Sequence, residues 1–215
     1  IVAYDIVKNA QERLNDFLER EKSQGLIGIT TGIKELDDIL YGWVPDDNSV
    51  IIARTNQGKT WLLFFFMMSA FRSGKRVLIY SGEMSELMVG YRFDTLYGNF
   101  SNTGMLTGNL ENKKENYVNY LDDLQKQDGF IVVTPAMLGG KRLDIPLLKE
   151  LIEKYKPDIV GVDQLSLMGD YRQTRNDSLR HVQKNISEDL YLVAQEYGIP
   201  VISVAQANRE VLKGK

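Results

Sequence analysis

The sequence predicts an α/β protein in which a mostly parallel sheet is covered by helices on both faces. Short runs of continuous apolar residues alternate with longer segments of helical periodicity, as they do where strands are buried between two layers of helices. One such run, residues 50–52, is followed by a polar loop and then by an almost wholly apolar helix. With 215 residues, of which 43% are apolar, the chain can form one such domain with a short appendage.

The chain opens with a predicted amphipathic helix over residues 1–22. Its apolar residues recur at spacings of three and four: Ala3, Val7, Ala10, Leu14 and Phe17. Such a helix either packs on its own domain or is offered to a neighbouring subunit, and the pattern alone leaves both open. Residues 23–28 then join it to the rest of the chain.

The remaining elements follow in order from apolar runs, periodicity and turn residues. Thr31 is expected to cap a short helix, and Lys59 opens a buried one. Strands are expected over residues 50–52, 77–81, 130–134, 159–163 and 201–205. Further helices are expected over residues 85–97, 117–127, 146–155 and 179–197, and a loop over residues 99–112, which are rich in Gly, Asn and Thr.

Residues 53–60 read A-x-x-x-x-G-K-T between the first strand and the buried helix, which is a phosphate-binding loop with Ala53 in place of its usual first Gly. Its backbone N–H groups and the helix N-terminus attract phosphate oxygens, Lys59 reaches the β- and γ-phosphates, and the Thr60 hydroxyl ligates Mg²⁺. The predicted ligand is ATP or another NTP with Mg²⁺. The predicted nucleotide contacts are Arg54, Thr55, Asn56, Gln57, Gly58, Lys59, Thr60 and Trp61.

Three polar residues end or follow strands, and ligands of parallel sheets lie at those ends. Asp163 ends an apolar strand, where an acid beside a phosphate loop holds Mg²⁺. Glu83 either deprotonates an attacking water or merely precedes a helix N-terminus. Gln206 either contacts the γ-phosphate or is a solvated strand-end amide.

Composition and charge restrict the remaining possibilities. The net charge of −3 argues against a protein coated in nucleic acid but allows a local basic groove. Candidate DNA contacts follow strand ends: Arg172, Arg175 and Arg180, then Arg209, Lys213 and Lys215. There are no cysteines, and the longest apolar run, residues 61–71, is too short to span a bilayer. We therefore expect a cytoplasmic protein that does not enter a membrane.

With these residues identified, the chain resembles the C-terminal motor domain of DnaB-type replicative helicases, within the RecA-like P-loop ATPases. Five segments resemble that family's entry motif and its ARPxxGKT, SLEM, DYLQLM and SQLNR motifs. They are Thr31-Gly32 through Leu36-Asp37, Ala53-Arg54-x-x-x-Gly58-Lys59-Thr60, Ser81-x-Glu83-Met84 with Arg92, Asp163-x-Leu165-x-Leu167-Met168, and Ala205-Gln206-x-Asn208-Arg209. Departures at Thr55, Gly82, Gln164 and Ala207 indicate a divergent member, such as one encoded by a phage.

The resemblance implies a linker helix over residues 1–22 that docks on a neighbouring subunit, followed by a RecA-like ATPase domain over residues 23–215. It makes Glu83 the catalytic base, Gln206 the phosphate sensor and Lys59 a catalytic cation. It implies a ring, a hexamer by the family's habit, that hydrolyses ATP, translocates on single-stranded DNA and unwinds duplex, with a helicase loader and primase as partners. The family's main DNA loop and arginine finger follow the sensor strand, so residues 23–215 are expected to be incomplete at the C-terminus.

Two other classes remain open at this point. In a RecA-like recombinase or clock-type ATPase, ATP gates assembly without strand separation, and the phosphate loop and basic segments suit that class as well. The SLEM-like and AQxNR-like segments, together with the linker helix, favour the helicase. A small-molecule P-loop kinase is disfavoured because no Arg-rich lid is evident.

Overall fold

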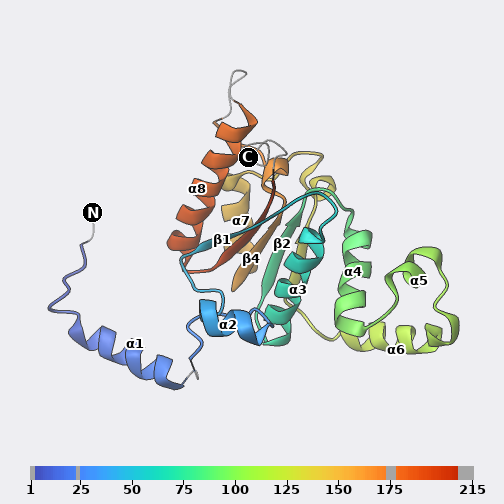
Figure 1. Cartoon of the computed structure of the whole chain (residues 1–215), viewed down its shortest axis with the longest axis horizontal. Coiled ribbons are helices and arrows are strands. Elements are labelled where there is room, and N and C mark those ends of the chain that lie inside the picture. Colours follow the sequence, from blue (N-terminus) through green and yellow to red (C-terminus); the bar gives the residue numbers. More distant parts are fainter. Residues whose placement is uncertain (1–2, 23–24, 173–177, 208–215) are drawn as a thin grey trace, which may run out of the picture.

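The computed structural model describes residues 3–22, 25–172 and 178–207. Its strands form one five-stranded sheet in the order β1-β5-β4-β2-β3, with every pairing parallel (Figure 1). The strands are β1 (Asn48–Ala53), β2 (Val77–Ser81), β3 (Phe130–Val133), β4 (Ile159–Asp163) and β5 (Val201–Gln206). Since all five strands run the same way, their carboxyl ends share one edge of the sheet, and the predicted parallel α/β fold is confirmed.

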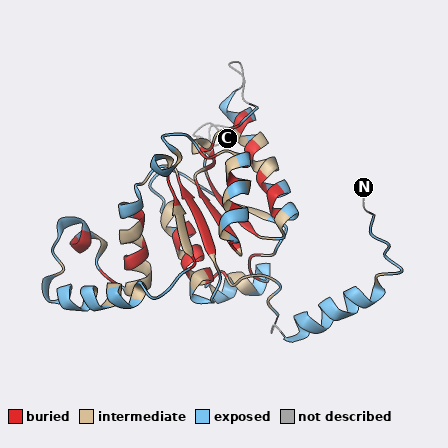
Figure 2. Cartoon of the chain, turned by 180° about the vertical axis from the view of Figure 1, so that it is seen from behind, coloured by how far each residue is buried: buried red, intermediate tan, exposed pale blue. Residues whose placement is uncertain are grey.

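Helices cover both faces of the sheet, as expected. They are α1 (Ala10–Lys22), α2 (Lys34–Leu40), α3 (Lys59–Arg72), α4 (Glu86–Gly98), α5 (Asn102–Thr107), α6 (Lys114–Leu124), α7 (Ile145–Tyr155) and α8 (Leu179–Tyr197), with short 3₁₀ turns at Glu111–Lys113, Pro135–Leu138 and Leu165–Leu167. Helices α7 and α8 pack on the face that carries Tyr80 and Val162, whereas α3 and α4 pack on the face that carries Ile79. The strands are therefore buried on both sides (Figure 2).

The buried helix α3 lies close to the sheet because β4 offers a glycine beneath it. A Cβ built on Gly161 would lie 3.0 Å from Met67 Sδ and 3.3 Å from Ile79 Cγ1. The side chains of Leu63, Phe64 and Met67 are completely buried against the strands. This packing fixes the axis of α3, and with it the direction in which its N-terminus points.

The first helix is shorter than predicted. It begins at Ala10, and the described residues before it form turns in which Asp5 Oδ1 accepts hydrogen bonds from the backbone N–H groups of Val7 and Lys8. This local carboxylate bonding competes with helical bonding, so the prediction of a helix over residues 1–22 is wrong at its N-terminal end. No residue of α1 is buried, and it extends away from the sheet (Figures 1 and 2).

Two further local predictions are wrong. Thr31 does not cap α2: Ile33 is the N-cap residue, and Thr31 Oγ1 instead closes a turn with the backbone of Ile33. The predicted loop over residues 99–112 contains α5, whose N-cap Ser101 accepts a hydrogen bond from the Gly104 backbone N–H. Among the described residues, no helix has the length and apolar character needed to cross a bilayer.

Candidate functional site at the carboxyl edge of the sheet

A cavity of about 410 Å³ opens at the carboxyl ends of the strands, within the size range of small-molecule sites. Its walls come from the loop after β1, the first turn of α3, the turn after β2, one face of α4 and the ends of β4 and β5. The lining residues are Thr55, Asn56, Gly58, Lys59, Thr60, Trp61, Glu83, Arg92, Gln164 and Gln206. Most of the nucleotide contacts predicted from the sequence therefore lie in one cavity; Arg54 and Gln57 belong to the same exposed loop.

The loop between β1 and α3 has the backbone that a tight phosphate-binding turn needs. Asn56 and Gly58 adopt left-handed conformations, with φ of 60° and 77°, and α3 begins at the next residue, Lys59. A Cβ at Gly58 would meet no atom within 4 Å, so the glycine serves the positive φ rather than close packing. Lys59 Nζ donates a hydrogen bond to Arg54 O at 2.9 Å, which brings its ammonium group back over the loop.

Thr60 and Asp163 meet at the base of the cavity. Thr60 Oγ1 donates a hydrogen bond to Asp163 Oδ1 at 3.1 Å. The Asp163 side chain is buried, and its Oδ2 has no hydrogen-bond partner among the described residues. Burial raises the pKa of Asp163 to about 6, and the charge of Glu83 adds to the shift, while the Thr60 hydrogen bond opposes it.

A hard cation fits this pair of residues. An orphaned carboxylate oxygen beside a hydroxyl is the oxygen donor set that Mg²⁺ prefers, and buried charge is normally paired or bound to metal. The described residues contain no cluster of three or more acidic or His side chains that could hold a metal alone. A cation bound here would therefore take its other ligands from phosphate oxygens and water.

The two other strand-end residues also reach the cavity. Gln164 Nε2 donates a hydrogen bond to Glu83 Oε1 at 3.3 Å. The N-cap residue of α4 is Ser85, not Glu83, so the Glu83 carboxylate is left to the cavity. Gln206 Nε2 donates to Thr55 Oγ1 at 2.7 Å and so connects the end of β5 to the phosphate-binding loop.

The sequence reasoning missed a role for two residues of the cavity. Arg92 stood only within a family segment and Gln164 only as a departure from one. The guanidinium of Arg92 lies over the Trp61 ring, with 4.8 Å from Cζ to the ring centroid. Both contacts depend on how α4 and the end of β4 lie against the loop, which no local pattern encodes.

The candidate DNA contacts are less well defined. Arg172 pairs with Asp189 at 2.6 Å and with Asp170 at 3.4 Å, so its charge is largely balanced within the fold. Arg180 is exposed at the start of α8. Arg175, Arg209, Lys213 and Lys215 lie outside the described residues.

Comparisons with known proteins give the chain its family. Residues 28–215 match the model of the DnaB-like helicase C terminal domain. The chain is similar to the replicative DNA helicase DnaB of Helicobacter pylori strain 26695 (28% identical over 211 residues, covering 95% of this chain and 42% of that protein). It is also similar to the DnaB of Haemophilus influenzae (26% identical over 209 residues, covering 95% of this chain and 44% of that protein).

Solved structures agree on the fold. The ATPase domain of a phage protein superposes with a TM-score of 0.81 and 22% identity, covering 100% of this chain and 75% of that one. A DnaB-like replicative helicase, solved in a study of its interactions with primase, gives a TM-score of 0.77 and 21% identity, covering 100% of this chain and 51% of that one. The chain spans less than half the length of the curated relatives named above. It belongs to the family of DnaB-like helicase C-terminal domains.

Proposed function

We propose that this chain is the ATP-hydrolysing motor domain of a replicative DNA helicase. Acting in the cytoplasm as part of a ring, it couples hydrolysis of ATP or another NTP to translocation on single-stranded DNA and to unwinding of duplex. The observation that carries the proposal is that Lys59, the Thr60–Asp163 pair and Glu83 line or border one cavity at the carboxyl edge of the sheet. Membership of the helicase family supports this reading over a recombinase or a clock-type ATPase.

In the proposed mechanism the phosphate-binding loop and Lys59 hold the nucleotide. The positive end of α3 and the loop N–H groups attract the phosphates, and Lys59 exchanges its hydrogen bond to Arg54 O for phosphate oxygens. Thr60 and Asp163 would hold Mg²⁺, which supplies charge neutralisation between the β- and γ-phosphates. Asp163 would act through its unpaired Oδ2 and Thr60 through its hydroxyl oxygen.

Glu83 and Gln206 would act on the γ-phosphate side. The Glu83 carboxylate lies in the cavity and is oriented by the Gln164 amide, so it is placed to accept a proton from an attacking water. Gln206 would report the γ-phosphate to the segment after β5, because its amide already bonds the loop at Thr55. Arg175, Arg209, Lys213 and Lys215 remain proposed DNA contacts, while the ion pairs of Arg172 give it a bracing role as well.

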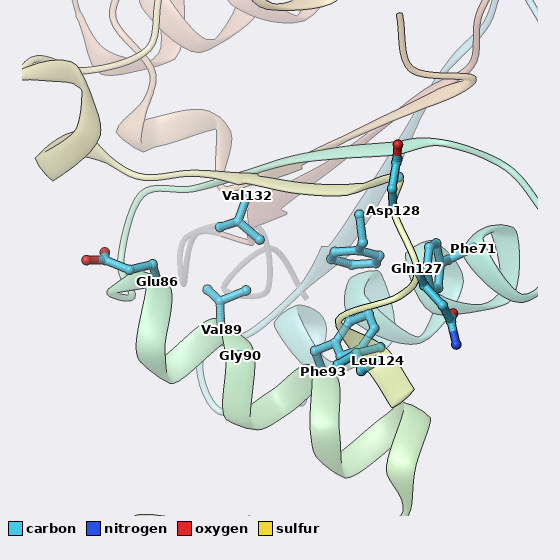
Figure 3. Close-up of a pocket in the computed structure, with 11 residues that line it drawn as sticks. Phe71, Glu86, Val89, Gly90, Phe93, Leu124, Gln127, Asp128 and Val132 are labelled. Atoms are coloured by element: carbon cyan, nitrogen blue, oxygen red, sulfur yellow. The ribbon is translucent and has the colours of Figure 1, made fainter. Parts of the chain in front are cut away.

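The ring would be held by α1, which we propose docks on a second copy of this chain. Leu14, Phe17 and Leu18 are 48%, 61% and 44% exposed, an apolar surface that its own domain does not cover. A second cavity, of about 250 Å³, lies away from the nucleotide site between α4 and the segment before β3 (Figure 3). Its walls are mostly apolar: Phe71, Val89, Gly90, Phe93, Leu124, Phe130 and Val132. We propose that the partner's α1 inserts there.

Primase and a helicase loader are proposed as further partners of the whole protein. Primase is supported by the matched helicase whose structure was solved together with a study of its primase interactions.

Replacing Glu83 with Gln is expected to leave nucleotide binding intact and to slow hydrolysis by about 10²–10⁴-fold, since the amide keeps the shape but cannot accept a proton from water. Phosphate release under saturating ATP measures the rate. Glu86→Gln is the matched control, because Glu86 lies three residues further on and lines the second cavity. Equal rates for parent and Glu83→Gln would assign the base to another residue.

Replacing Asp163 with Asn tests the metal role. The change removes a buried charge whose Oδ2 has no partner among the described residues, so the melting temperature of the nucleotide-free protein should stay the same or rise. The additional stabilisation that Mg²⁺ gives in the presence of an ATP analogue should disappear. Thermal melts with analogue, with and without Mg²⁺, measure both effects, and Asp38→Asn on α2 is the control. A full Mg²⁺ effect in Asp163→Asn would refute the assignment.

Two substitutions test the docking of α1. Gly90→Leu should fill the second cavity, because a Cβ there meets no atom within 4 Å, and it should not destabilise α4. Phe17→Ser removes the proposed insert from a surface that is already exposed. Sedimentation should show both variants with a smaller mass than the parent and unchanged melting temperatures. Val7→Ser, an exposed apolar residue outside α1, is the control. Parent-like mass in both variants would place the interface elsewhere.

A further inference from the structure

Arg92 stands out among the cavity residues because nothing on the protein uses its hydrogen-bond donors. Among the described residues it makes no hydrogen bond or ion pair, and its Nη1 is buried without a partner. A buried donor without an acceptor is costly, and more so when it is charged. Its neighbourhood is acidic rather than neutral, since Asp163 and Glu83 both act electrostatically on it. Yet neither carboxylate comes close enough to form an ion pair.

What touches the Arg92 guanidinium is the face of Trp61. The ring centroid lies 4.8 Å from Cζ, a cation–π distance. Trp61 is the third residue of α3, directly after Thr60, so the ring stands on the same rigid turn as the proposed phosphate and metal contacts. A stacked ring fixes the plane of a guanidinium without consuming any of its five N–H groups, whereas a carboxylate would consume two of them and neutralise the charge.

A second arginine–aromatic pair between the same two helices makes the contrast clear. Arg72, at the other end of α3, lies 5.4 Å from the Tyr97 ring centroid. Its Nη2, however, donates hydrogen bonds to the carbonyl oxygens of Leu96 and Tyr97. The Arg72 pair is therefore satisfied within the protein, while the Arg92 pair borders the nucleotide cavity with its donors unused.

We propose that Trp61 is a positioning residue that stacks on Arg92 and presents its guanidinium to the phosphates of the bound nucleotide. This rests on the proposed nucleotide site and deepens it: beside Lys59, the same chain supplies a second cation for the triphosphate. The indole holds the guanidinium against the pull of Glu83 and Asp163. The planar fork of donors that remains matches phosphate oxygens.

The test measures affinity for a non-hydrolysable ATP analogue with Mg²⁺, by calorimetry, in Trp61→Ala, Arg92→Ala, the double variant and Trp61→Phe. We expect Arg92→Ala to weaken binding about 10–100-fold, the range of a lost charge-assisted hydrogen bond. Trp61→Ala should weaken it about 3–30-fold, and Trp61→Phe, which keeps a stacking face, less than about 3-fold. The double variant should bind no more weakly than Arg92→Ala, because Trp61 acts only through Arg92.

Arg72→Ala is the matched control and should bind the analogue like the parent, and a thermal melt of each variant checks that it is folded. Parent-like affinity in Trp61→Ala overturns the inference, as does a loss from Trp61→Ala that is equally large when Arg92 is already Ala, since Trp61 would then act by itself. A parent protein that binds no nucleotide would instead refute the proposed function together with this inference, so the two failures are distinguishable.

Discussion

The hydrogen bond from Thr60 Oγ1 to Asp163 Oδ1 joins two residues that are 103 positions apart, and the candidate site depends on it. It ties the first turn of α3 to the end of β4, so the phosphate-binding loop and the acid of the central sheet keep a fixed relation. The parallel sheet makes this contact possible because it brings every strand end to one edge. Around that contact lie Lys59 and Glu83, each placed by a different strand or helix.

The rigidity of this arrangement comes from packing away from the site. Helix α3 is apolar nearly all round and is buried against the strands, so its N-terminus cannot tilt without opening the core. Gly161 allows that helix to approach the sheet closely. The cost of this design is a buried carboxylate with an unpaired oxygen and a buried guanidinium with an unpaired nitrogen. Both unmet groups border the cavity, which is where a protein keeps polar groups that a ligand will satisfy.

Much of the fold was predictable because its signals are local or periodic. The buried strands are continuous apolar runs, and the strand Val77–Ser81 and helix Leu179–Tyr197 have the predicted bounds. Predictions were wrong where a side chain bonds its own backbone, as Asp5 does before α1 and Ser101 does at α5. The strand-end acids could be named from the sequence, but the Trp61–Arg92 stack and the Gln164–Glu83 bond could not, since they depend on how separate elements pack.

The central claim is that the cavity at the carboxyl edge of the sheet binds a nucleoside triphosphate through Lys59. Calorimetric titration of the protein with a non-hydrolysable ATP analogue and Mg²⁺, repeated on Lys59→Ala, tests it most directly. The account predicts one site per chain in the parent and a loss of at least about tenfold in Lys59→Ala, because a charge-assisted hydrogen bond contributes about 1.5–3 kcal/mol. Equal affinity in the two proteins, or no binding to the parent, would contradict it.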